Sequence, residues 1–180
     1  IDVKTIGLGG DSEISIGTNG RIEVGPQRAV PLSLIASRVP EVIGLLQSDL
    51  ADTDGGSLHG RFLVLPFGKD DRPPPDGLSA RESEIFAQVS DFPLALRRVA
   101  VSSAAQRAIS ALRRKGLVQL CGFTPSDAAH VLKLQSNWNL DAAQLGAKLL
   151  ARFRTMKLLD ESELDGFCRE VWSAAVTKSA

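Results

Sequence analysis

The fold of this chain is decided first by Thr5-Ile6-Gly7-Leu8-Gly9-Gly10-Asp11-Ser12-Glu13-Ile14-Ser15-Ile16, in which glycines lead into a strand pattern. Residues 12–16 alternate polar and apolar side chains, and residues 21–24 do the same. Such alternation is typical of half-buried strands. Between them lies Gly17-Thr18-Asn19-Gly20, and Asn-Gly tolerates the positive φ angles of a tight turn. We therefore predict a β-hairpin over residues 5–24.

Past the hairpin, Gly25-Pro26 is expected to end the second strand. Residues 33–47 predict helix, interrupted at Pro40, and residues 61–65 predict a buried strand. Residues 68–77 contain three consecutive prolines, which have no backbone N–H to donate, so this segment predicts an exposed linker. We place a domain boundary there.

The chain from residue 79 onward is predicted to be mainly helical. Ser79 and Glu82 have the spacing of a capping box. In residues 79–120, three short helices followed by a strand give a winged-helix-like order. A further helix start is predicted at Thr124-Pro125-Ser126-Asp127, where threonine caps the helix and proline fills its first position. The expected class is therefore α+β, with a β-rich part at 1–78 and a helical part at 79–180.

Composition excludes some functions. The 180 residues carry a formal net charge of zero, so no global field recruits nucleic acid or an anionic membrane. No apolar run approaches the roughly 20 residues that span a bilayer, and no membrane partner is expected. The two cysteines are separated and lie in apolar surroundings, which predicts buried thiols and a reducing, cytoplasmic setting. Charge is uneven: residues 1–78 hold 7 basic and 11 acidic residues, and the remainder is net basic.

The glycine segment is the candidate site. Gly7, Gly9 and Gly10 allow backbone N–H groups to approach an anion closely. Asp11 is a candidate ligand for a divalent cation, and Ser12 for a phosphate oxygen. The segment is neither a Walker loop nor a Rossmann fingerprint, because no Gly-Lys-Ser/Thr and no following helix are present. An ordinary glycine-rich turn remains the alternative interpretation of this string.

Two blocks of sequence resemble the hydantoinase/oxoprolinase family. The first covers residues 2–12 and continues at 20–26, where a strand, a glycine loop, a hairpin and a Val-Gly-Pro exit follow in the family's order. The second, at 122–132, 138–139 and 142–147, is similar to the family's later Thr-Pro-x-Asp-Ala-x-His-Val-Leu segment. Together the blocks cover roughly a quarter of the chain.

The resemblance implies a piece of an actin-like ATPase core from the C-terminal part of a longer enzyme. Family members couple ATP hydrolysis to the opening of a cyclic amide such as 5-oxoproline or a hydantoin, and relatives carboxylate ketones. It implies ATP, with magnesium or another divalent cation, as cofactors, and a partner subunit or a second copy as partner. A metal role falls on Asp2 and Asp11, although Lys4 stands where the family often has histidine. The catalytic nucleophile is not identified, and this piece alone is expected to be inactive.

Two other functions stay open: a winged-helix module that binds DNA or regulates without catalysis, and a scaffold domain without chemistry. Nucleic acid is not the expected partner, because the predicted third helix offers few groups for base edges beyond Gln106 and Arg107. His130, on an apolar helix face, is predicted to be a packed core residue, and His59, in a loop, a surface residue.

Overall fold

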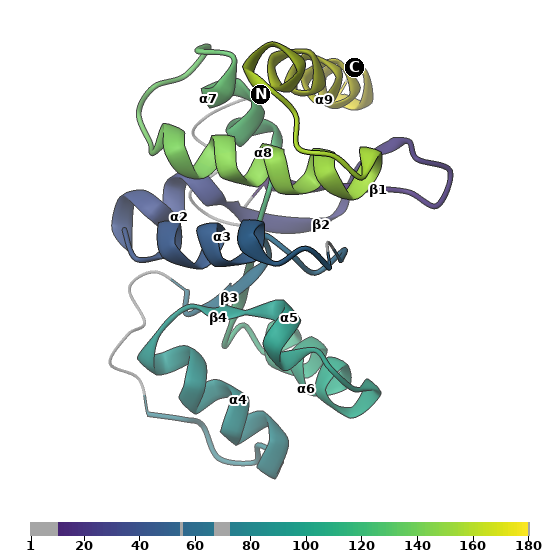
Figure 1. Cartoon of the computed structure of the whole chain (residues 1–180). Helices are drawn as coiled ribbons and strands as arrows, with labels where there is room; N and C mark the ends of the chain where they lie inside the picture. Colours follow the sequence, from purple (N-terminus) through teal and green to yellow (C-terminus); the bar gives the residue numbers. More distant parts are fainter. Residues whose placement is uncertain (1–10, 55, 67–72, 180) are drawn as a thin grey trace. The chain divides into compact units, whose positions relative to one another are not determined.

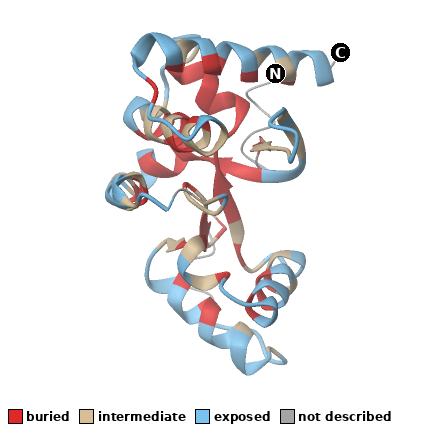
Figure 2. Ribbon diagram, turned by 45° about the vertical axis from the view of Figure 1, so that its right-hand side comes forward, coloured by how far each residue is buried: buried red, intermediate tan, exposed pale blue. Residues whose placement is uncertain are grey.

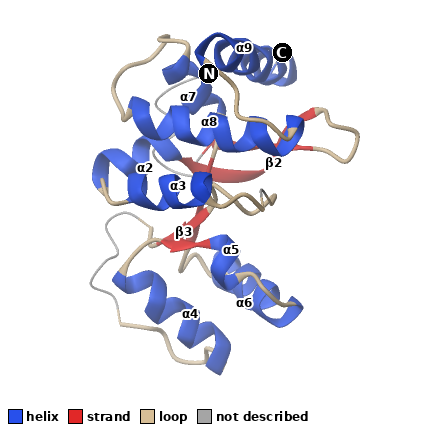
Figure 3. Cartoon of the chain, in the orientation of Figure 1, coloured by secondary structure: helices blue, strands red, loops and turns tan. Residues whose placement is uncertain are grey.

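The computed structural model describes residues 11–54, 56–66 and 73–179. The predictions for Asp2, Gly7, Gly9 and Gly10 lie outside them. Helices and strands are mixed along the chain, which confirms the predicted α+β class (Figures 1 and 3). In chain order the elements are β1 (Asp11–Ile16), β2 (Ile22–Pro31), α2 (Leu32–Arg38), α3 (Val42–Ala51), β3 (Phe62–Val64), α4 (Ala80–Asp91), β4 (Leu94–Ala95), α5 (Leu96–Val99), α6 (Ser103–Arg114), β5 (Gln119–Gly122), α7 (Pro125–Val131), α8 (Leu140–Thr155) and α9 (Glu161–Ser179).

The chain divides into two compact units, and the division differs from the boundary predicted after residue 78. Unit 1 comprises residues 1–60 and 122–180, and unit 2 comprises residues 61–121. The reason lies in strand pairing: β3 pairs antiparallel with both β4 and β5, so it belongs with the helices that follow it. Helices α7 to α9 return to the first unit instead of forming one domain with residues 79–120.

The predicted hairpin is confirmed over its described part, residues 11–24, in unit 1. Strands β1 and β2 pair antiparallel, and Gly17 N–H donates to the Arg21 carbonyl at 2.8 Å across the turn. Gly20 has a φ of 78°, a left-handed conformation that glycine adopts without strain. The predicted end of β2 at Gly25-Pro26 is wrong, because β2 continues to Pro31. The register shifts between Ser12 and Ile14, and this irregularity allows pairing to resume at Arg28 and Ala29.

The core of unit 1 forms around α8, which contacts α2, α3, α7 and α9. One face of α8 consists of small buried residues, Ala142, Ala143, Gly146 and Ala147. A Cβ on Gly146 would lie 2.5 Å from Leu32 Cδ1, closer than atoms pack, so glycine is needed for α2 to approach. Helix α7 is buried at every residue (Figure 2).

Unit 2 contains a small antiparallel sheet in the order β4-β3-β5. Helix α4 packs against α6 and β3 through Ile85, Phe86 and Val89. The Ser79 hydroxyl accepts from Glu82 N–H at 3.1 Å, so the predicted cap is present. Helix α6 buries Ala105, Ala108, Ile109 and Leu112 at helical spacing. Gly116, with a φ of 70°, follows its C-cap.

Met156 is the C-cap of α8, and its backbone is strained. It has a left-handed φ of 63°, a conformation that costs a residue with a Cβ about 1–2 kcal/mol. Its side chain is 85% exposed, so truncation removes almost no packing. We expect Met156→Gly to raise the free energy of unfolding by roughly 0.5–1 kcal/mol, after the entropic cost of glycine. Urea unfolding measures this; Met156→Ala, which keeps the strain, should show no gain, and an equal gain in both would contradict the explanation.

Candidate functional site

Asp11, the described end of the glycine segment, bonds to the first turn of α7. Its Oδ2 accepts from Ser126 N–H at 3.2 Å and from Ser126 Oγ at 3.0 Å. Its Oδ1 accepts from the N–H of Ser12 at 3.0 Å. The residue is only 8% exposed, and burial raises the pKa of its carboxyl group, against the lowering effect of the Ser126 hydrogen bonds. Asp11 therefore fixes the exit of the glycine segment to a helix 115 residues away.

Ser12, the predicted phosphate ligand, lies in β1 opposite Arg28 of β2. The Arg28 guanidinium is close enough to Asp11 to lower the pKa of that carboxyl group. A positive charge beside Ser12 suits an anion. The sequence alone did not indicate Arg28, because Arg28 becomes a neighbour of Ser12 only through the strand register. The other predicted ligands, Gly7, Gly9 and Gly10, lie outside the described residues.

The first turn of α7 is fixed by a network around Asp127. Thr124 caps α7, as predicted, and together with Asp127 it forms a capping box. The Asp127 carboxyl group, fully buried, also accepts from Ser33 N–H at 2.8 Å, Ser33 Oγ at 2.6 Å and Leu32 N–H at 3.1 Å. Burial raises the pKa of Asp127, and the hydrogen bonds from Ser33, Leu32 and Thr124 act in the opposite sense. One side chain thus joins the beginnings of α2 and α7.

His130 is a packed core residue, as predicted. Its Nδ1 lies 2.7 Å from the Ser126 carbonyl oxygen, and its Nε2 accepts from Trp138 N–H at 3.2 Å. The imidazole also stacks on the Trp138 ring, with 5.4 Å between ring centroids. Because both ring nitrogens are used and the residue is buried, His130 has no free atom for a substrate.

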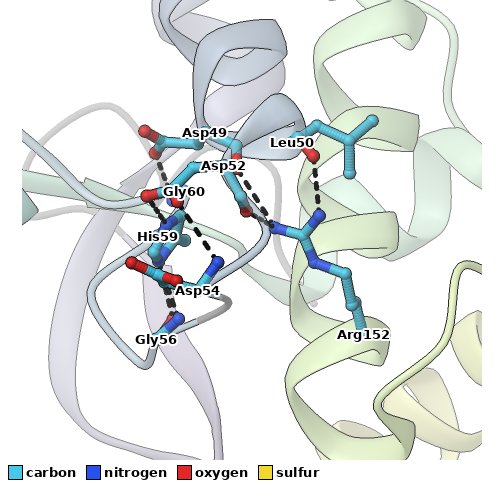
Figure 4. Close-up of polar contacts among 8 residues, drawn as sticks. All are labelled: Asp49, Leu50, Asp52, Asp54, Gly56, His59, Gly60 and Arg152. Atoms are coloured by element: carbon cyan, nitrogen blue, oxygen red, sulfur yellow. Dashed lines mark hydrogen bonds and ion pairs between the residues drawn. The ribbon is translucent and has the colours of Figure 1, made fainter.

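The loop between α3 and β3 holds a second polar cluster, shown in Figure 4. His59 Nε2 lies 2.9 Å from Asp52 Oδ2, and Gly56 N–H donates to His59 Nδ1 at 2.9 Å. The His59 side chain is 7% exposed, so its predicted surface position is wrong. The sequence around His59 is polar and glycine-rich, and only the folded loop brings Asp52 onto the ring. Both nitrogens are again used within the loop, so this His–Asp pair is structural.

Arg152 of α8 caps the C-terminal end of α3 in the same cluster (Figure 4). Its guanidinium donates to the carbonyl oxygens of Leu50 at 2.6 Å, Asp49 at 3.1 Å and Asp52 at 3.0 Å. The last carbonyls of a helix have no partner within it, and a cation also suits the negative end of the helix dipole. On the other side, the buried Asp49 carboxylate accepts from Gly60 N–H at 2.8 Å.

A pocket of about 390 Å³ lies among α7, α8 and α9, and the residues that line it include Lys133, Arg169 and Trp172. Its lining does not include Asp11 or Ser12.

The two cysteines are buried thiols outside any disulfide, as predicted. Burial raises the pKa of the Cys168 thiol to about 12, which keeps this thiol protonated.

The described residues contain no cluster of side chains that could by itself hold a metal ion. In the ranges given above, no three His, Cys, Asp or Glu side chains gather as metal ligands. Both Asp11 oxygens already accept hydrogen bonds from the protein. Asp11 positions the end of the glycine segment through Ser126, and no step of the proposed chemistry passes through a metal on Asp11. Among the same described residues, no helix is both long enough and apolar enough to cross a membrane.

Comparison of the chain with protein-family models, with curated proteins and with solved structures found no match.

Proposed function

We propose that the chain is part of a cytoplasmic ATP-dependent enzyme that opens a cyclic amide, of the hydantoinase/oxoprolinase kind, or of a related carboxylase subunit. In this proposal the N–H groups of Gly7, Gly9 and Gly10 bind nucleotide phosphate, and Ser12 contributes its hydroxyl. ATP would activate the amide by phosphorylating its carbonyl oxygen, which turns a poor electrophile into a reactive one. The site for the cyclic amide lies outside the residues that we assign.

The observation that carries the proposal is the contact between Asp11 and Ser126. The two blocks that resemble the family lie far apart in sequence, and each supplies one partner of this contact. If the resemblance were accidental, nothing would require the two blocks to meet. Asp11 holds the end of the glycine segment against α7, and Arg28 places a positive charge beside Ser12. An anchored glycine segment next to a cation is a suitable environment for phosphate.

The test is thermal unfolding of the full-length protein with magnesium and ADP. A ligand at 100 times its Kd stabilises the folded state by about 2.7 kcal/mol, and this stabilisation raises the Tm. We expect Gly10→Val and Ser12→Ala to reduce or abolish this rise. A matched control is Gly166→Val on α9, where open space surrounds the missing Cβ.

Three results would contradict the proposal: no Tm rise with ADP in the unmodified protein, an undiminished rise in Gly10→Val, or an equal loss in Gly166→Val. Unfolding curves without nucleotide show whether each variant folds. If ADP binds, ATP consumption stimulated by 5-oxoproline or by a hydantoin would identify the substrate class.

A further inference from the structure

Helix α6 of unit 2 has one buried and one exposed face, and the exposed face is basic. Its buried residues pack against α4. On the exposed side, Ser103, Arg107, Ser110 and Arg114 follow one another at helical spacing and form a stripe along the helix. The short serines between the arginines let a flat or grooved surface approach the helix closely.

The sequence segment that contains this stripe carries charge of a single sign. From Phe92 to Ser126 the sequence contains six basic residues and no aspartate or glutamate. Lys115 is paired with Glu82 of α4 at 2.9 Å, whereas Arg107 and Arg114 are exposed on the stripe. The net charge of the whole chain is zero because acidic residues outside this segment balance its basic residues. The total charge therefore does not indicate the basic segment. The local field favours a polyanion.

Unit 2 also has the order of elements used to present a helix to DNA. Helix α5 is followed by a short turn, and α6 begins at Ser103 after the Ser102 cap, which accepts from Ala105 N–H at 3.1 Å. In helix-turn-helix proteins the N-terminal residues of the second helix contact base edges. Here these positions hold Arg107 and Gln106, whose Nε2 donates to the Ala100 carbonyl at 3.3 Å and whose Oε1 can still accept. Val101, two residues before the helix, is 73% exposed. A winged helix has its wing between its last two strands; in unit 2 the central strand β3 comes before α4, so that hairpin is not formed.

We propose that α6 enters the major groove of duplex DNA, with Arg107 and Arg114 on phosphates, and Gln106 and Val101 at base edges. The two arginines are seven residues apart, roughly 10 Å along the helix axis, comparable with the ≈ 12 Å groove width. Proteins that bind single-stranded nucleic acid stack its bases on aromatic side chains, and α6 contains no aromatic residue. A single strand is therefore not the expected ligand. Duplex RNA has a major groove too narrow for side chains to read. This function is independent of the nucleotide site proposed above.

The test is fluorescence anisotropy of a labelled duplex of mixed sequence with the full-length protein at about 50 mM salt, where phosphate contacts are strong. We expect Arg107→Gln/Arg114→Gln to weaken binding at least tenfold and to reduce the salt slope by about 1.8, the change for two phosphate contacts. The matched control is Arg81→Gln/Arg169→Gln, which removes the same charge from exposed positions on α4 and α9; its effect should stay below about threefold.

Two further measurements separate the groove contact from simple charge attraction. A preferred duplex is first selected from a pool of random sequences. Gln106→Ala should reduce the difference in affinity between this preferred duplex and a random one, with little change in the salt dependence of binding. Heparin and single-stranded DNA should bind more weakly than duplex. The proposal is overturned by no duplex binding at 50 mM salt, by equal losses in the two double variants, or by equal affinity for duplex and heparin. None of these results depends on ADP binding.

Discussion

Asp127→Ala is expected to lower the free energy of unfolding by about 3–5 kcal/mol, the largest loss that we predict for a single side chain. Asp127 is fully buried, and its carboxyl group accepts hydrogen bonds from the beginnings of both α2 and α7. Alanine would leave the N–H groups of Leu32, Ser33 and Thr124 buried without acceptors, and each such group costs about 1–3 kcal/mol. The expected result is a large shift of the urea unfolding midpoint at an unchanged slope.

A matched control separates this network from ordinary helix capping. Asp160 also accepts from a backbone N–H, that of Glu163 at 2.8 Å, but it is exposed. Asp160→Ala should cost about 0.5–2 kcal/mol, as for other N-caps. If Asp127→Ala cost no more than Asp160→Ala, the buried network would not stabilise the fold as described.

Arg152→Ala is expected to cost about 2–4 kcal/mol. Three carbonyl oxygens at the end of α3 accept from this one guanidinium, and hydrogen bonds to charged groups contribute roughly 1.5–3 kcal/mol each in stability measurements. Water can reach part of the site, which keeps the total below a simple sum. Arg152→Lys should recover only part of the loss, because an ammonium group has no planar fork for several acceptors.

The control lies two residues further along the same helix. Arg154 forms an exposed pair with Glu170 at 2.8 Å, and exposed pairs contribute about 0–1 kcal/mol. Chemical unfolding of Arg152→Ala and Arg154→Ala measures both effects under the same conditions. Equal losses would show that Arg152 acts only through its general charge and not through the α3 carbonyls.

The parts of the fold that depend on neighbouring residues were predictable from the sequence. The Asn-Gly turn, the Ser79 cap and the Thr124 cap all use residues within four positions of one another. The helix break at Pro40 and the strand at residues 61–65 were predictable for the same reason. In each case backbone geometry and local hydrogen bonds decide the structure.

The parts that depend on distant residues were not predictable. Ser33 donates to Asp127 across 94 residues, and Arg152 reaches Leu50 across 102. Neither residue differs in its sequence neighbourhood from an exposed serine or arginine. The unit boundary was misplaced because the proline-rich segment suggested a linker between domains, whereas β3 before it pairs with strands after it.

The candidate site was predictable in part. The sequence indicated Asp11 and Ser12 by their position after the glycines, and it also indicated α7 as a separate motif. It did not indicate that Asp11 would bond to Ser126, nor that Arg28 would lie opposite Ser12. Through these contacts Asp11 positions the end of the glycine segment against α7.

The central claim is that the main-chain amides of residues 7–12 bind a nucleotide phosphate. It is tested most directly by titrating the ¹⁵N-labelled protein with magnesium and ADP and following the backbone amide resonances. We expect saturable shifts at Gly7, Gly9, Gly10 and Ser12, with smaller shifts at Ser126 through the Asp11 contact. Unmoved resonances at the three glycines, or shifts confined to the pocket among α7, α8 and α9, would contradict it.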